Sequence, residues 1–430
     1  MSFLTRPMVT AFFLFLLLSA APARAHVPGQ ASSQATSPPT DDDLAALQAS
    51  AISGNAQSQY ALANHYYHGI GIPQDYRQAL LWYSRSANQG FAPAQSQLGS
   101  MYQHKWGVPR DYKRALSYYR LSAKQGDALA EFDLGGVYED GVGVKRDYKQ
   151  ALDWYRKAAN QNLGQAEKQV GYFYQCGYGV KQDLVQARSW YLRAAGHGNA
   201  DAENQLGFFA EEGWGEPKNF PDALAWFHKA AEHGSNDAEE NIGYLYENGI
   251  GVPTDYSRAM SWFVEAAAHG NSNASNQIGW MYQHGQGVAV DDARALSWYG
   301  LAAEQGNPHA QRNLDDLTSD LEDDGTYQSA TSPVHDPALA AAERWVKIDD
   351  LHRQIAGLEG DAQNQDDLAD QVEHMGKGKH DAVSKIFSVV GSIPAAKYHL
   401  EAAKYRAEAA QLRQELAQIE NQSAASVPAP

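Results

Sequence analysis

The pattern of apolar and polar positions between residues 55 and 306 repeats every 36 residues, seven times, without insertion or deletion. One column of this repeat is always glycine, from Gly71 to Gly287, and another is always alanine, from Ala79 to Ala295. A third column is aromatic throughout: Trp82, Tyr118, Trp154, Trp190, Trp226, Trp262 and Trp298. A fixed period of this length is typical of solenoid architectures.

Each unit predicts two helices. In residues 94–104 the apolar or small side chains follow the three-to-four spacing of an amphipathic helix: Ala94, Leu98, Met101 and Tyr102. A turn containing Gly107 and a proline follows, and Asp111 is placed to cap a second helix over residues 112–124. Gly126 supplies the left-handed residue that ends it.

The small columns allow close helix packing. The alanine column and a further glycine column, which runs from Gly99 to Gly279, let neighbouring helix axes approach. Aromatic pairs such as Trp154-Tyr155 are expected to fill the space between successive hairpins, so that loss of one buried Trp costs about 3–5 kcal/mol. A single hairpin cannot bury its face alone, so the ends need caps.

Both caps are visible in the sequence. Residues 43–54 align with a second helix, and residues 307–317 form a lone first helix in which Asp315 replaces the packing glycine. The solenoid is therefore predicted to span residues 41–317. The fold class is all-α.

The units resemble a known family. The stretches that carry the likeness are LGGVYEDGVGV at residues 134–144 and DYKQALDWYRKAA at residues 147–159. They are similar to the Sel-one-like repeat, a tetratricopeptide-like family. The resemblance implies a right-handed α/α superhelix of seven helix-turn-helix repeats with half-repeat caps, and a role as an adaptor that holds protein partners.

The segments outside the solenoid have other patterns. Residues 1–25 are similar to a secretory signal peptide, with Arg6, an apolar stretch and an A-x-A site before His26. We therefore predict an exported protein, periplasmic or secreted, with a bacterial periplasm favoured, and no transmembrane segment in the mature chain. Residues 26–40 and the tail 423–430 are predicted to be disordered.

Residues 318–337 are acidic and contain prolines, which indicates a linker. Residues 338–422 then predict an antiparallel coiled-coil hairpin. Its heptad positions are Ile348, Leu351, Ile355, Leu358, Ala362, Ala369 and Val372, and then Tyr398, Ala402, Tyr405, Ala409, Leu412, Leu416 and Ile419. Between them, residues 381–390 predict a short apolar helix, and self-association through the hairpin stays open.

The composition narrows the classes of partner that the protein can bind and excludes a disulfide within the chain. The chain is 43% apolar, as a globular protein is, and its net charge of −17 argues against nucleic acid and anionic lipid as partners. Cys176 is the single cysteine, so no disulfide can form within the chain, and we place it in an inter-helix loop.

The sequence shows no catalytic motif. The repeated G-x-G pairs lie between helices rather than after a strand, so they do not predict a cofactor site. Histidines in one repeat column, such as His68 and His104, lie too far apart to share a metal ion. We predict no enzyme activity, cofactor or metal. A structural role in a cell-envelope or polysaccharide-export assembly and a β-lactam-binding hydrolase are the alternatives.

The first helices are expected to line the concave face and to bind a protein partner, favouring one with a basic segment. Amide and aromatic side chains recur there beside acidic ones. The predicted partner-binding residues are Tyr172, Gln205, Phe208, Glu211, Asn241, Tyr244, Gln277 and Trp280.

Overall fold

The structure is a computed structural model that describes residues 41–323, 336–377 and 395–425. Within these ranges all regular secondary structure is helical, and there are no strands, as the repeat predicts. The predicted signal peptide, residues 26–40, the apolar helix at residues 381–390 and the end of the tail lie outside the described residues. The chain divides into two compact units, residues 1–118 and 119–430, and each is described by itself.

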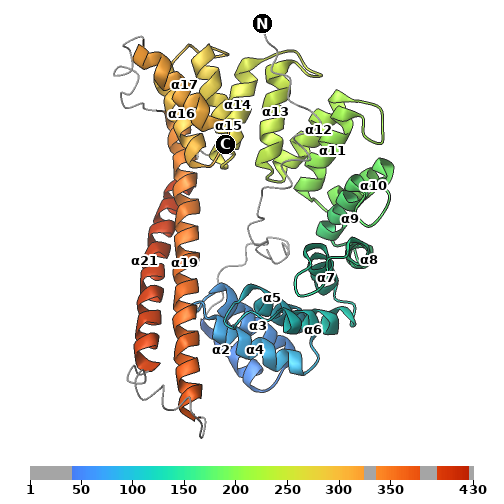
Figure 1. The fold of residues 1–430 in the computed structure, drawn as a ribbon, viewed down its shortest axis with the longest axis vertical. Helices are drawn as coiled ribbons and strands as arrows, with labels where there is room; N and C mark the ends of the chain where they lie inside the picture. Colours follow the sequence, from blue (N-terminus) through green and yellow to red (C-terminus); the bar gives the residue numbers. More distant parts are fainter. Residues whose placement is uncertain (1–40, 324–335, 378–394, 426–430) are drawn as a thin grey trace. The chain divides into compact units, whose positions relative to one another are not determined.

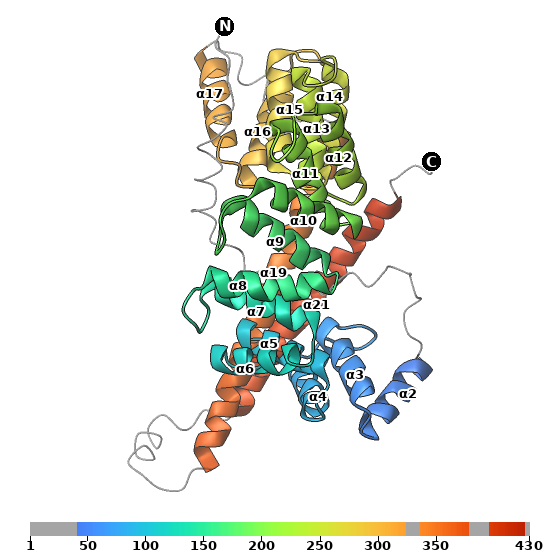
Figure 2. The ribbon, with the colours of Figure 1, turned by 90° about the vertical axis from the view of Figure 1, so that its right-hand side faces the viewer.

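Each of the seven units forms one pair of helices, and one capping helix, α2, precedes the first pair (Figure 1). They are α2 (Asp41–Ile52), α3 (Ala56–His68), α4 (Tyr76–Asn88), α5 (Ala92–His104), α6 (Tyr112–Ala123), α7 (Ala128–Asp140), α8 (Tyr148–Asn160), α9 (Gly164–Cys176), α10 (Leu184–Gly196), α11 (Ala200–Glu212), α12 (Phe220–Glu232), α13 (Asn236–Asn248), α14 (Tyr256–Ala268), α15 (Ser272–His284), α16 (Asp292–Glu304), α17 (Ala310–Asp323), α19 (Pro337–Lys377) and α21 (Ala395–Ala425). Helices α11 to α16 stack side by side as successive hairpins (Figure 2).

The helix ends are set by capping residues, among them Asp111, which the sequence predicts. Asp111 caps α6, because its Oδ1 accepts the backbone N–H groups of Lys113 and Arg114 at 3.0 Å each. At the other end of a first helix, Gly141 takes φ 73° and its N–H donates to the Val137 carbonyl at 3.0 Å. Each hairpin therefore begins and ends at a fixed position in the repeat.

The turn requires glycine for a second reason besides its backbone angle. Gly179 has a φ of 67°, and a Cβ placed on it would lie 2.5 Å from the carbonyl oxygen of Tyr148 in the preceding unit. Only a residue without a side chain allows this approach. The turn thereby fixes the spacing between one hairpin and the next.

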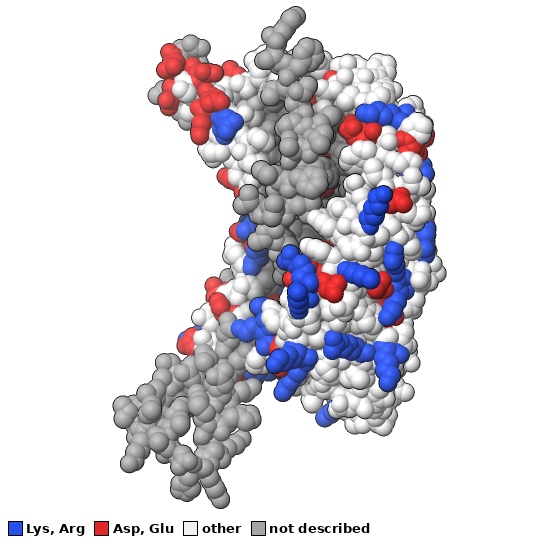
Figure 3. Space-filling view, turned by 45° about the vertical axis from the view of Figure 1, so that its right-hand side comes forward, with Lys and Arg blue, Asp and Glu red and all other residues white. Residues whose placement is uncertain are grey.

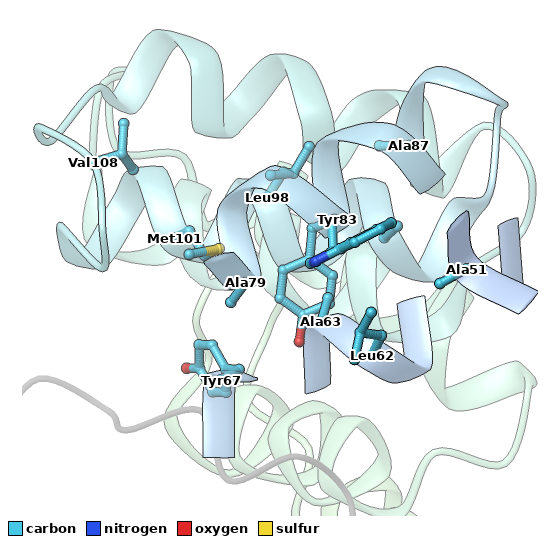
Figure 4. Close-up of a cluster of buried hydrophobic side chains, with 12 residues drawn as sticks. Ala51, Leu62, Ala63, Tyr67, Ala79, Tyr83, Ala87, Leu98, Met101 and Val108 are labelled. Atoms are coloured by element: carbon cyan, nitrogen blue, oxygen red, sulfur yellow. The ribbon is translucent and has the colours of Figure 1, made fainter. Parts of the chain in front are cut away.

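The predicted small columns form the core. All seven alanines from Ala79 to Ala295 are at most 2% exposed. Figure 4 shows this core in the first unit, where Ala79 and Tyr83 of α4 lie among Leu62 of α3 and Leu98 of α5. The rigid packing of small residues and rings explains why the units stack without insertions.

The aromatic prediction needs one correction. In the units of α8, α10, α12 and α14, the ring that fills the core is the second of each pair: Tyr155, Tyr191, Phe227 and Phe263, each at most 1% exposed. The preceding Trp154, Trp190, Trp226 and Trp262 are only half-buried. Successive helix residues point about 100° apart, so only one ring of a pair can face the glycine column.

The last repeat is followed by a polar cap. Leu317 and Leu321 of α17 pack against Ala295 and Tyr299, while the other face of α17 is acidic and exposed (Figure 3). Because α17 continues to Asp323, the first six residues of the segment predicted as a linker are helical. Leu321 lengthens the buried stripe by one turn, which explains the longer helix.

Helices α19 and α21 run antiparallel and pack along their length (Figure 1). Their shared core uses predicted heptad positions, among them Leu351, Ile355, Ala409 and Leu416. Lys347 and Glu415 form an ion pair across the two helices at 2.9 Å.

The first turns of α19 dock on the repeats, a contact that the sequence analysis did not predict. Leu339 and Ala342 are buried against α14 and α16, and Trp298 Nε1 donates to Asp336 Oδ2 at 3.3 Å. The Trp345 ring lies so close to Gly270 that a side chain at Gly270 would overlap it. The hairpin is therefore anchored to the sixth and seventh units.

Candidate partner-binding surfaces

The predicted partner-binding residues lie on the first helices α9, α11, α13 and α15. These helices have 13 residues each and end at a left-handed glycine, so equivalent side chains keep the same register. Six of the eight are half-buried: Tyr172, Gln205, Phe208, Tyr244, Gln277 and Trp280. Glu211 and Asn241 are buried, with only 6% of each exposed.

The amide side chains of this surface join neighbouring first helices. Gln277 donates to Glu247 at 2.6 Å, and Asn241 donates to Asn204 at 3.0 Å. Burial raises the pKa of Glu247, and the hydrogen bonds from Gln277 and Asn248 oppose that rise. Two of the three predicted amides, Asn241 and Gln277, therefore help to hold neighbouring units together.

The aromatic side chains are supported by their own units. The Phe208 ring meets Phe227 edge-on at 5.3 Å, and the Trp280 ring stacks on His284 at 4.0 Å. Such contacts hold a ring in one orientation while leaving part of it exposed. Rigid, half-exposed rings are the kind of side chain that dominates protein interfaces.

Cys176 lies beside this surface. It is the last residue of α9, not a loop residue as predicted, and it is half-buried. Burial raises the pKa of the Cys176 thiol, although a hydrogen bond with Tyr172 opposes the rise. A thiol with a raised pKa is a poor nucleophile at neutral pH.

The structure also shows a column of buried glutamates that the sequence analysis missed. Glu167 and Glu203 are fully buried, and Glu239 is 6% exposed. Each meets a histidine 30 residues later, at the end of the second helix of the same unit. The His–Glu distances are 3.5 Å for His197 and Glu167, 2.6 Å for His233 and Glu203, and 2.9 Å for His269 and Glu239.

Two of these glutamates also bind a cation from the second helix. Arg193 lies 2.9 Å from Glu167, and Lys229 lies 3.0 Å from Glu203. A buried carboxylate needs such partners because burial removes its hydration. The spacing of 30 residues between Glu and His recurs three times in the sequence, and it was the signal available for finding this column.

A pocket of about 540 Å³ opens beside the third of these glutamates. Helices α12, α13 and α14 form it, and its lining residues are His228, Ala231, Glu232, Glu239, Ser261, Trp262 and Glu265. The Trp262 ring meets His228 edge-on at 5.1 Å, and burial lowers the pKa of His228. Six of its seven lining residues lie on the second helices α12 and α14, and none of the eight predicted partner-binding residues lines it.

Over residues 41–323, 336–377 and 395–425, no three His, Cys, Asp or Glu side chains come together as metal ligands. In the same ranges, none of the helices combines the length and the apolar character that crossing a bilayer requires.

Stacked helix pairs of constant length define an α-solenoid protein. Seven Sel1 repeats match the chain, at residues 56–91, 92–127, 128–163, 164–199, 200–235, 236–271 and 272–307. The chain therefore belongs to the Sel1 repeat family, as the resemblance indicated. Sel1 repeat proteins are generally protein-interaction scaffolds and are typically non-catalytic.

Two solved structures are similar to the chain. One is c5321, a protective antigen present in uropathogenic Escherichia coli strains that has an SLR fold. It is 32% identical in sequence with a TM-score of 0.57, and the match covers 85% of this chain and 71% of the c5321 chain. The other is a Sel1 repeat protein from Oxalobacter formigenes, which is 34% identical with a TM-score of 0.53 and covers 64% of this chain and 80% of its own. A search of curated proteins finds no match.

Proposed function

We propose that this protein is an exported scaffold that binds a protein partner on the first-helix surface of α9 to α15. The observation that carries the proposal is the column of half-exposed aromatics at one repeat position: Tyr172, Phe208, Tyr244 and Trp280. Units one to three have Asn64, Ser100 and Gly136 in that column. The change from small or polar residues to rings marks one stretch of the solenoid for contact.

The charge of this stretch favours a partner segment that carries Lys or Arg. Glu211, Glu212, Glu240 and Glu247 lie on α11 and α13, and Glu212 and Glu240 are half-exposed. The whole chain has 51 acidic and 34 basic residues, so a basic segment would also be attracted over a distance.

Export is part of the proposal because residues 1–25 have the charged, apolar and A-x-A regions of a signal peptide. A bacterial periplasm is the compartment that we favour. A chain of this kind with one cysteine depends on packing rather than disulfides there.

Site-specific photocrosslinking in the native host tests both the surface and the compartment. A photoreactive amino acid at position 244 or 280 is expected to capture a partner in the exported fraction. The same amino acid at Val185, which is 62% exposed on second helix α10, is the control.

Equal capture from all three positions, or from none in a folded and exported protein, would contradict the proposed surface. Recovery of the protein only in the cytoplasm would contradict export. Capture of several subunits of one envelope complex would instead support the structural role in an envelope assembly.

A further inference from the structure

Tryptophans of the second helices are covered by cations from their own chain. A lysine or arginine three residues later lies over the ring in four units. The distances to the ring centre are 4.4 Å for Arg85 on Trp82, 3.5 Å for Lys157 on Trp154, 4.3 Å for Arg193 on Trp190, and 5.1 Å for Lys229 on Trp226. The electron-rich face of an indole attracts a positive charge, so this arrangement is stabilising.

In the fourth and fifth units the same cation has a second partner. Arg193 and Lys229 also bind the buried Glu167 and Glu203 of their units. The repeat thus contains a cation site with two walls: an indole face and a buried carboxylate.

The sixth unit keeps both walls but lacks the cation. Trp262 and Glu239 occupy the repeat positions of Trp226 and Glu203, while Glu265 stands where Lys229 stands one unit earlier. The pocket described above lies at this place. Its lining has three carboxylates and, in the described part of the chain, no lysine or arginine.

We propose that this pocket binds a guanidinium or ammonium group supplied in trans, as the arginine or lysine side chain of a protein partner. The visiting cation takes the place that Arg193 and Lys229 occupy in their units, over the Trp262 ring and beside Glu239. Glu265 and Glu232 add negative charge at the open side. This assignment rests on the proposed scaffold function, but it concerns a different face.

Neighbouring groups favour a visiting cation. Among the described residues that line the pocket, His228 is the single basic one, and burial lowers its pKa, which favours its neutral form. His269 is not among the lining residues and binds Glu239 at 2.9 Å, so a visiting cation shares this carboxylate with a histidine, as Arg193 and Lys229 do in their units. An organic cation also suits the site better than a metal ion, because an indole face attracts it while offering no ligand atom.

Fluorine NMR of the full chain labelled with 5-fluorotryptophan tests the site. The resonance lost in Trp262→Phe identifies Trp262 among the ten tryptophans. The probe is a blocked Gly-Arg-Gly peptide, and the same peptide with citrulline is the control, because citrulline has nearly the shape of arginine without its charge. The Trp262 resonance is expected to shift with the arginine peptide, with a dissociation constant on the order of 1 mM, and not with citrulline.

Glu265→Arg restores the cation that four other units have and should therefore fold. It is expected to shift the Trp262 resonance without ligand and to weaken peptide binding about tenfold or more. Glu304→Arg, which makes the same change of charge at an exposed position on α16, should leave the titration unchanged.

Three results would overturn the proposal: an equal response to citrulline, unchanged binding in Glu265→Arg, or binding of agmatine without binding of the blocked peptide. The last result would assign the pocket to a small organic cation. Because this titration needs no identified partner, it can fail while crosslinking from positions 244 and 280 succeeds, and the reverse also holds.

Discussion

Residues in the column of the buried glutamates join the first helix of a unit to its second helix, and in three units they do so by binding a histidine. In the third unit Gln161 donates to Glu131 at 2.8 Å, and in the first unit Gln89 donates to Gln59 at 2.8 Å. The contact between the start of a first helix and the end of a second therefore needs a hydrogen bond but no charge. In the fourth to sixth units a histidine makes this contact, and the histidine adds a titratable group.

His269→Gln should remove a pH-dependent part of the stability. The hydrogen bond to Glu239 raises the pKa of His269 above its ordinary 6.5, although burial opposes the rise. The folded protein thus binds this proton more tightly than the unfolded chain, so the stabilisation is complete below pH 6.5 and is lost as the pH rises through the folded pKa. The expected loss in His269→Gln is below about 1 kcal/mol, because more than half of the His269 side chain is exposed.

Chemical denaturation at several pH values measures this effect. The difference from wild type should be largest at slightly acidic pH and shrink as the solution becomes basic. His309→Gln, at an exposed position, is the control. A difference that grows with pH would show that the Glu239 bond does not stabilise the protonated histidine.

Two adjacent glycines of α7 should respond in opposite ways to alanine. A Cβ on Gly135 would lie 2.5 Å from the Tyr155 ring, so Gly135→Ala should destabilise by about 1–3 kcal/mol. A Cβ on Gly136 would have its nearest neighbour, the Tyr155 hydroxyl, at 3.7 Å. Gly136→Ala should therefore stabilise by about 0.5–1 kcal/mol through its higher helix propensity. Thermal melts of both variants make the comparison, and equal destabilisation would argue against ring contact at the glycine column.

At the scale of helices, the sequence predicted most of the fold because the same pattern of packing and capping residues recurs in seven units. Asp111 and Gly126 could be assigned as helix ends, since each recurs in six of the seven units, with Asn219 and Asn162 in the remaining ones. The contacts of α19 could not be predicted in this way. Trp345 and Leu339 occur once, and their partners, Gly270 and residues of α14 and α16, are distant in sequence, so no repetition reveals the pairing.

The candidate sites show the same limit. The sequence predicted a face that carries Tyr172 and Trp280, because residues in one repeat column lie on the same face of the stacked first helices. It did not predict that Asn241 is buried and bonded to Asn204, since that depends on the distance between neighbouring units. The pocket at Trp262 was missed because its signal is a departure from the repeat rather than the repeat itself: Glu265 stands in a column where four other units have a cation.

Leu339→Ala should loosen the anchor of α19. Leu339 is 6% exposed and packs with residues of α14 and α16, so its truncation should cost about 2–4 kcal/mol. Hydrogen exchange should rise at the start of α19 and in the helices it contacts. Leu121→Ala, at a leucine that is 47% exposed, should change stability by less than about 0.5 kcal/mol. Unchanged exchange in α19 would show that the docking contributes little.

At the scale of the whole molecule, stability should be local. Helices α3 and α4 pack on each other, and α13 and α14 do the same ten helices later. In an array of this kind the free energy is nearly a sum of terms for single units and their neighbours. A defect in one unit should therefore open that unit and its neighbours and leave distant ones protected.

Leu62→Ala tests this expectation in the first unit. Leu62 is 1% exposed in the core that α3 shares with α4, so removal of its side chain should cost about 2–5 kcal/mol. Hydrogen exchange followed by mass spectrometry should show faster exchange in α2 to α5, with α13 to α16 as in the wild type. Ile278→Ala, at an equally buried position of α15, should give the reverse pattern. If either substitution raised exchange evenly across all of these helices, the array would unfold as one cooperative body, and a partner bound at α9 to α15 would then stabilise the first unit as well.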